Sequence, residues 1–291
     1  MQRLAFPNQT GTQGTRTTAK PSRGGVDFLP LTSSSSPLFR KSCVSRHFTS
    51  GQTDDVTSRP MDMAYAPVND FHMNQYVVAC TATRQAVFID CGAATSEQLG
   101  VFIDWLSSSQ HKELYTLTAV WQTHAHLDHV AGLGLLRQQF PNIDIHLHAN
   151  EREIYNGFAE RCQEFGFVVE NPNLPADSEL SYFDSDQRTV SLGELEFSII
   201  PTPGHSPGHV GFYEPQTKSF FGGDFIMQGS IGRTDFPTSS PEEMNKSLET
   251  FVLHMSDDTV IFSGHGPATT LKNEKATNPF LQAYANDWGG A

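Results

Sequence analysis

The sequence of 291 residues has few cysteines, few basic residues and no long apolar run. Four cysteines are present, and no two of them form a Cys-x-x-Cys pair. Neither a disulfide framework nor a cysteine metal site is therefore indicated, and a reducing compartment is expected. No uninterrupted apolar stretch is long enough to cross a bilayer, so a membrane-spanning protein is not expected.

Basic residues are scarce and unevenly distributed. Lys and Arg number 19 against 32 Asp and Glu, which gives a net charge of −13. The first 60 residues hold eight basic and three acidic residues, which leaves 11 basic and 29 acidic residues, a net charge of −18, in the remainder. A body that acidic binds nucleic acid or an anionic membrane poorly. A nuclease is therefore disfavoured, and neither nucleic acid nor membrane is expected as a partner.

Residues 1–60 have the composition of a targeting segment. They are rich in Ser, Thr, Arg and Gly and include a run of four serines at residues 33–36, which is typical of an organelle transit segment. Arg46, two positions before Phe48, resembles part of a mitochondrial processing site. We therefore expect a mitochondrial protein, with a plastid location or a plain disordered tail as alternatives, and one domain over residues 61–291.

What the sequence does contain is a dense group of metal-binding side chains. Four fall within six positions, between an apolar run at residues 115–121 and a helical pattern at residues 130–140. They are His124, His126, Asp128 and His129. Imidazole and carboxylate together suit zinc, iron or manganese. Alternate residues of an extended segment point the same way, so the first two can bind one ion while the last two lean toward a second.

Short apolar runs and helical patterns fill the rest of the chain. Strands are expected at residues 74–80, 85–89, 115–121, 143–147, 194–200, 209–213, 219–221 and 259–262, and helices at residues 96–106, 130–140, 151–165, 241–253 and near the C-terminus. Residues 171–186 are expected to form a loop. This order predicts an α+β fold in which two sheets face each other with helices outside.

Three predicted strands end in a candidate ligand beside glycine. These ligands are His205, Asp224 and His265. Glycine lets the backbone turn tightly and approach closely at a sheet edge. A carboxylate has two oxygens and can bridge two cations, so Asp224 is the candidate bridge. The spacing assigns His205 to the ion of His124 and His126, and His265 to that of Asp128 and His129. Seven ligands exceed the four of a closed structural site, which favours catalysis.

The motifs His-x-His-x-Asp-His, Thr-Pro-Gly-His, Gly-Asp and Gly-His-Gly, in this order, resemble the metallo-β-lactamase superfamily. Residues 230–237, 264–267 and 278–280 resemble the short glyoxalase II-like hydrolases within it. The resemblance covers about residues 70–285 and implies an αββα sandwich with the metals at one edge. It also implies two divalent ions (zinc, iron or manganese), catalytic roles for Asp128 and Asp224, and hydrolysis of a small thioester such as S-lactoylglutathione. With 26 residues after His265, the helical glutathione-binding domain of the long form is not expected.

Several alternatives stay open. Arg233 is a candidate for binding a substrate carboxylate, and an ion pair with Asp235 is the competing interpretation. Residues 232–235 also resemble a persulfide dioxygenase, which would hold one iron through His124, His205 and Asp224, although the Gly-His-Gly-Pro motif favours the hydrolase. A β-lactamase is disfavoured because no cysteine is placed as a metal ligand, and an inactive binding protein would not need seven ligands. His209 is assigned to a strand core or to support of the ligands. The oligomeric state is not determined by the sequence.

Overall fold

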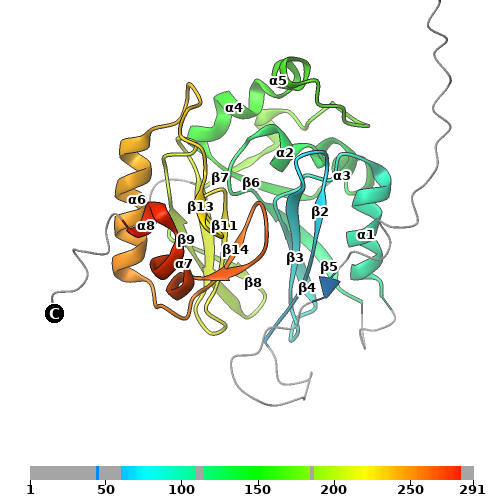
Figure 1. Ribbon diagram of the computed structural model, residues 1–291. Coiled ribbons are helices and arrows are strands. Elements are labelled where there is room, and N and C mark those ends of the chain that lie inside the picture. The colour runs from blue at the N-terminus through cyan, green and yellow to red at the C-terminus, as the bar shows by residue number, and fades with distance from the viewer. Residues whose placement is uncertain (1–43, 46–59, 109–113, 184–186, 283–291) are drawn as a thin grey trace, which may run out of the picture. The chain divides into compact units, whose positions relative to one another are not determined.

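The computed structural model describes residues 44–45, 60–108, 114–183 and 187–282, and two large sheets run through these ranges (Figure 1). The predicted leader, residues 1–60, falls almost wholly outside them, so the transit segment and the organelle stay predictions. Within the described ranges, no helix is long and apolar enough to span a membrane.

The first sheet is mixed and follows chain order. Its strands are β1 (Val44–Ser45), β2 (Met61–Val68), β3 (Met73–Cys80), β4 (Gln85–Ile89), β5 (Thr116–Trp121), β6 (Asp144–His148) and β7 (Ser181–Phe183). Strands β1 to β4 pair antiparallel, and β4 to β7 pair in parallel. The parallel half therefore brings the carboxyl ends of β4, β5 and β6 to one edge of the sheet.

The second sheet runs in the order β15 (Thr269–Thr270), β14 (Val260–Ser263), β11 (Ser219–Gly223), β10 (Val210–Glu214), β9 (Leu195–Pro201) and β8 (Thr189–Leu192). Strands β11 and β14 are parallel, and the other neighbours are antiparallel. A separate two-stranded ribbon is formed by β12 (Ile226–Met227) and β13 (Ser230–Ile231).

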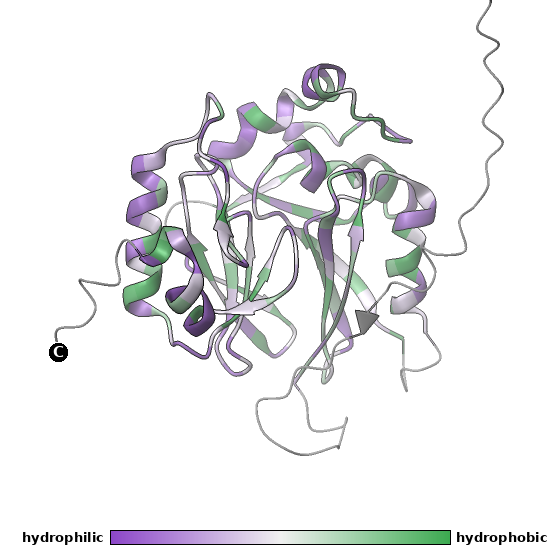
Figure 2. Cartoon of the chain, viewed as in Figure 1, coloured by the Kyte–Doolittle hydropathy of each residue, from purple (hydrophilic) through white to green (hydrophobic). Residues whose placement is uncertain are grey.

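Helices cover the outer face of each sheet. Those against the first sheet are α1 (Ser96–Leu106), α2 (Leu127–Val130), α3 (Leu133–Gln139), α4 (Arg152–Asn156) and α5 (Phe158–Phe165). Those against the second are α6 (Pro241–His254), α7 (Leu271–Thr277) and α8 (Pro279–Gln282). Helix α6 carries both hydrophilic and hydrophobic residues (Figure 2) and buries one side, including Leu248 and Phe251. The layers confirm the predicted α+β sandwich.

Strand β3 of the first sheet is buried on both faces. In β3, Val77 and Ala79 pack toward the helices, while Tyr76 and Val78 pack toward the second sheet. Successive side chains of a strand point to opposite faces, so both kinds of position are apolar. This explains why residues 76–80 of β3 form a continuous apolar run in the sequence.

Aromatic rings fill the space between the two sheets. Trp121 on β5 lies 5.2 Å from Phe197 on β9 and 5.4 Å from Phe212 on β10, measured between ring centroids. All three rings are fully buried. Each such side chain contributes about 1.5–3 kcal/mol through burial, and together they pack the two sheets against each other.

The structure corrects several boundaries predicted from the sequence. The helix expected at residues 151–165 breaks at Gly157, and the one expected at residues 130–140 is replaced by α2 and α3. The loop expected at residues 171–186 contains β7, and β2 was not predicted at all. The helix expected at residues 96–106 forms with these bounds as α1, and Thr95 caps it by accepting a hydrogen bond from the Gln98 N–H. Whether a segment such as β2 or β7 forms a strand depends on its neighbours more than on its own residues.

Candidate metal centre

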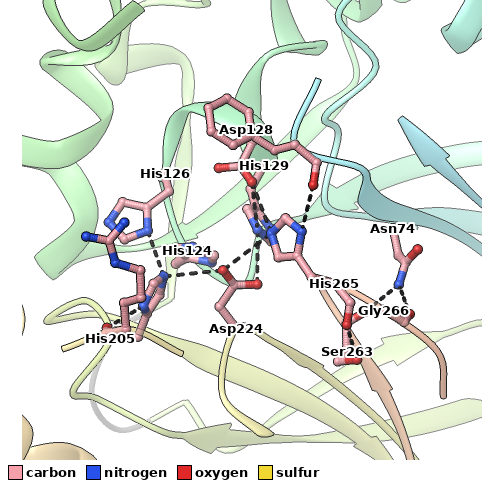
Figure 3. A network of polar contacts seen from close by, with 12 residues as sticks. Asn74, His124, His126, Asp128, His129, His205, Asp224, Ser263, His265 and Gly266 are labelled. Carbon is pink, nitrogen blue, oxygen red and sulfur yellow. Dashed lines mark hydrogen bonds and ion pairs between the residues drawn. The ribbon is translucent and has the colours of Figure 1, made fainter. Parts of the chain in front are cut away.

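The segments that follow the carboxyl ends of four strands carry all seven candidate ligands (Figure 3). The loop after β5 carries His124 and His126, and α2 follows at once with Asp128 and His129. The loops after β9, β11 and β14 carry the other three, which are His205, Asp224 and His265. Loops held by a rigid scaffold commonly position functional groups, and here both sheets contribute to one cluster.

Three groups of side chains offer ligand atoms that lie within 4.8 Å of one another. Two of them match the division expected from the sequence, and the third joins the two halves. The groups are His124 with His126 and His205, Asp128 with His129 and His265, and His124 with His129 and Asp224. We call the first group site A and the second site B.

The Asp224 carboxylate lies between the two halves. Its Oδ1 is 3.3 Å from His129 Nε2, and its Oδ2 is 3.4 Å from His205 Nε2 and 3.5 Å from His265 Nε2. These separations are longer than ordinary hydrogen bonds. Ligands of a cation approach the ion rather than one another, so the spacing fits a carboxylate that bridges site A and site B.

Three buried atoms of the cluster have no hydrogen-bond partner in the part of the chain that the structure describes. They are His124 Nε2, His129 Nε2 and Asp224 Oδ1. A buried polar atom left unsatisfied costs about 1–3 kcal/mol, and a divalent cation satisfies the lone pairs of imidazole nitrogen and carboxylate oxygen alike. The residues present therefore fit a metal centre with nitrogen and oxygen ligands.

Three of the histidines are oriented through their second ring nitrogen. His129 Nδ1 lies 2.8 Å from Asp90 Oδ2, His205 Nδ1 lies 2.7 Å from the Arg233 carbonyl, and His265 Nδ1 lies 3.1 Å from the Phe71 carbonyl. Each acceptor places the ring proton on Nδ1 and leaves the Nε2 lone pair directed at the cluster. Such outer contacts set ligand orientation and metal affinity.

Asp90 supports both sites and was not identified from the sequence. Besides His129, it accepts hydrogen bonds from the backbone N–H and the hydroxyl of Thr123, at 2.7 and 2.9 Å. Because the Thr123 hydroxyl donates to Asp90, it can accept from His124 Nδ1 at 3.0 Å. Asp90 adopts φ 58°, a left-handed conformation that costs energy outside glycine and is often found at functional sites.

His209 holds the backbone of Asp224 in place. This matches the interpretation of the sequence in which His209 supports the ligands. Its Nε2 accepts a hydrogen bond from the Asp224 backbone N–H at 3.2 Å, and its Nδ1 lies 2.7 Å from the Thr202 hydroxyl. Burial lowers the pKa of His209 well below its ordinary value. The neutral ring is therefore a fixed spacer between β9 and β11 rather than a member of either ligand group.

The two sites differ in their proton affinity. Burial lowers the pKa of His124 and His205 and brings that of His126 to about 3. Burial acts the same way on His129 and His265, but the nearby carboxylates Asp224 and Asp128 outweigh it and raise both pKa values. In the metal-free protein the histidines of site B therefore bind protons more readily than those of site A.

Arg233 lies beside the metal centre and forms the ion pair that was the competing interpretation of the sequence. Its guanidinium binds Asp235 through two hydrogen bonds of 2.8 Å and lies 4.5 Å from the Phe236 ring centroid. The two guanidinium N–H groups that would bind a substrate carboxylate therefore donate to Asp235 instead, which is the ion pair of the competing interpretation. Its backbone carbonyl orients His205 instead.

Asn278, from the motif at residues 278–280, secures the ribbon that leads to Arg233. Its amide donates to the Met227 carbonyl at 3.3 Å and to the Ser230 carbonyl at 2.9 Å. The buried Glu274 carboxylate accepts from the Gly229 N–H at 2.8 Å. These bonds fix β12 and β13 against the C-terminal helices, so the segment beside the metal centre cannot move freely.

Comparisons with known proteins agree with this architecture. The family model of the metallo-beta-lactamase superfamily matches residues 68–265. The chain is 35% identical over 225 residues to "Hydroxyacylglutathione hydrolase GloC" of Haemophilus influenzae. The aligned residues make up 77% of this chain and 99% of that protein. It is similar to the crystal structure of BLEG-1 B3 metallo-beta-lactamase (30% identity, TM-score 0.62, 75% of this chain and 99% of that one). It is also similar to TTHA1623 in a di-iron-bound form (32% identity, TM-score 0.61, 74% and 99%). The chain therefore belongs to the metallo-beta-lactamase superfamily.

Proposed function

We propose that the protein is a metal-dependent, glyoxalase II-like hydrolase that cleaves S-lactoylglutathione or a related thioester to a hydroxy acid and a free thiol. The observation that carries this proposal is the Asp224 carboxylate between two groups of nitrogen and oxygen ligands. The identity of 35% to a protein named hydroxyacylglutathione hydrolase supports the same reaction class.

The chain's own residues define where the reaction would occur. When two divalent ions are bound, they supply an activated water at neutral pH and a Lewis acid for the carbonyl oxygen. Asp224 fixes the separation of the two sites, and Asp128, 3.1 Å from His265 Nε2, completes site B. In the net reaction a water oxygen bonds to the acyl carbon, the carbon–sulfur bond breaks, and the sulfur leaves as a thiolate. The residues that would hold the ions are His124, His126, His205, Asp128, His129, His265 and the bridging Asp224.

A single purification of the full chain tests this function. The protein is loaded with zinc or with iron, its metal content is measured, and thiol release from S-lactoylglutathione is followed. We expect two ions per chain and thiol release that is lost on Asp224→Asn substitution. Two ions without cleavage of any thioester would contradict the hydrolase.

The alternative is a persulfide dioxygenase with a single iron held by His124, His205 and Asp224. Its three ligands lie together here, but so do four further candidate ligands that such an enzyme does not need. Oxygen consumption with glutathione persulfide, measured on the same iron-loaded sample, separates the two reactions. Persulfide-dependent oxygen uptake with no thioester cleavage would replace the hydrolase by the dioxygenase.

A further inference from the structure

A cavity of about 300 Å³ opens directly onto the metal centre. Five candidate ligands contribute to its lining, and the rest of its wall is largely apolar. The apolar side chains are Phe71, Leu127, Phe165, Met227, Phe236 and Pro237. They come from five separate segments of the chain, so the apolar wall is assembled by the fold and not by one hydrophobic stretch. Ligand sites are commonly cavities of this size with few polar groups.

Phe236 forms the part of the wall nearest to site A. Its ring centroid lies 5.0 Å from that of His126 and 5.9 Å from that of His205. A group attached to a carbonyl that reacts at the cluster would therefore lie against this ring. A phenyl face offers dispersion contacts and no hydrogen bond to a hydroxyl.

Two further rings stand at the mouth of the cavity. Phe71 is 42% exposed and Phe165 is 52% exposed, and Phe71 is held in place by an edge contact with Phe167 at 5.2 Å. Large apolar side chains gathered at the opening of a cavity mark a binding surface. The apolar character of the cavity thus extends from the metal centre to the solvent.

Apart from the candidate ligands, the cationic side chains that the described residues contribute to the wall are Arg161 and Arg233. Arg233 is already paired with Asp235. Arg161 on α5 donates to the Ile154 carbonyl at 2.8 Å, and within the described ranges no carboxylate lies at ion-pair distance from it. The cavity therefore offers one cation to an anionic substrate, whereas glutathione carries two carboxylates.

We propose, on the basis of the hydrolase function above, that this cavity selects thioesters with an apolar acyl group, with Phe236 as the acyl-binding wall and Arg161 as the contact for one carboxylate on the thiol part. The net reaction is unchanged: the thioester and one water give an apolar carboxylic acid and a thiol. A 2-hydroxyacyl group such as lactoyl is the poorer substrate, because its hydroxyl would lie against the Phe236 ring, which offers it no hydrogen bond.

Thioesters of one uncharged thiol, N-acetylcysteamine, test the acyl preference on the metal-loaded full chain. The acyl groups are acetyl, propionyl, lactoyl, butyryl and hexanoyl. We expect kcat/KM to rise from acetyl to butyryl by about fourfold per methylene, with propionyl ahead of lactoyl. Thioethers of the same chain lengths, which water cannot cleave, are expected to give the same order in dissociation constants.

Substitutions in the cavity test whether its side chains cause the dependence on acyl length. Phe236→Ala is expected to flatten the dependence on acyl length, whereas Phe280→Ala, an equally large and 49% exposed ring outside the cavity lining, leaves it unchanged. Arg161→Gln is expected to raise KM for the glutathione thioester and not for the N-acetylcysteamine thioester of the same acid. The melting temperature of each variant reports on folding.

The outcomes separate this inference from the function on which it rests. Cleavage of lactoyl thioesters at least as well as propionyl and butyryl ones would overturn the apolar selection and leave the hydrolase standing. An unchanged acyl-length dependence in a folded Phe236→Ala variant would overturn the role of that ring. Failure to cleave any thioester would remove the hydrolase itself.

Discussion

The Glu151 carboxylate accepts a hydrogen bond of 2.9 Å from the backbone N–H of Ala125, the residue between His124 and His126. Its other oxygen accepts one of 2.6 Å from the Gly208 N–H, in the loop that follows His205. Burial raises the pKa of this carboxyl group. One buried side chain therefore ties together the two loops that carry all the ligands of site A.

Replacement of Glu151 by Gln is expected to weaken site A. The amide puts an N–H₂ group where an oxygen accepts from the backbone, so one of the two loops loses its anchor. We expect metal affinity at site A to fall about 10–100-fold and the free energy of unfolding of the metal-free protein to fall by about 2–3 kcal/mol. Chelator competition and urea unfolding measure the two effects.

The matched control for this change is Glu153→Gln, on the exposed side of α4. It removes the same charge two residues away without touching either loop. Equal losses in both variants would mean that net charge, and not the Glu151 anchor, controls the affinity of site A.

Asn74 performs the corresponding task for site B. Its side-chain amide donates to the Ser263 carbonyl at 3.1 Å and to the Gly266 carbonyl at 2.7 Å, on either side of His265 (Figure 3). Asn74→Ala is expected to lower metal affinity at site B about 10–100-fold and to leave site A unchanged, so the chain retains close to one ion after gel filtration. Asn156→Ala, at an exposed position, should retain two. Retention of two ions by Asn74→Ala would show that the turn keeps its geometry unaided.

Metal uptake by the two sites is expected to differ in proton release. Because the pKa values of His129 and His265 are raised and those of the three site A histidines are lowered, site B binds protons more readily, and an incoming cation must displace the protons that are bound. Affinity at site B should therefore fall as the pH decreases from 8 to 6, with little change at site A. Calorimetry in two buffers of different ionisation enthalpy measures the released protons. Equal release in both binding steps would contradict this difference.

The sequence indicated the candidate ligands more readily than the residues that hold these ligands in place. Histidines two positions apart and ligands beside glycine at strand ends form local patterns that can be recognised in isolation. Glu151 has no such pattern, because its partners Ala125 and Gly208 lie 26 and 57 residues away. Asp90 is a single carboxylate after an apolar strand, and its contact with His129 exists only once β4 and β5 are paired.

The same distinction applies to the fold. Strands β3 and β4 were predicted because burial on both faces leaves an apolar run in each, at residues 76–80 and 86–89. Strand β2 mixes Met, Asp, Ala, Tyr and Pro, so its register depends on β3 and not on its own composition. The break of the predicted helix at Gly157 likewise depends on α4 and α5 packing separately against the first sheet.

At Gly264 the addition of a single methyl group is expected to disrupt the metal centre. A Cβ at this residue would lie 2.2 Å from Asp224 Oδ1 and 2.8 Å from His129 Cε1, both of which are closer than such atoms approach. Gly264→Ala must therefore displace the bridging carboxylate, and a shift of about 1 Å at a reacting centre can lower the rate about 100-fold. We expect loss of bound metal and of activity with the secondary structure retained.

Gly100→Ala in α1 is the control for the added methyl group, because a Cβ there meets no atom within 4 Å. It should bind both ions and should stabilise the protein by about 0.5–1 kcal/mol, since alanine favours a helix interior over glycine. Elemental analysis, circular dichroism and urea unfolding compare the two variants. Normal metal content in Gly264→Ala would mean that Asp224 tolerates displacement, and the bridging role argued from its position between the two sites would no longer hold.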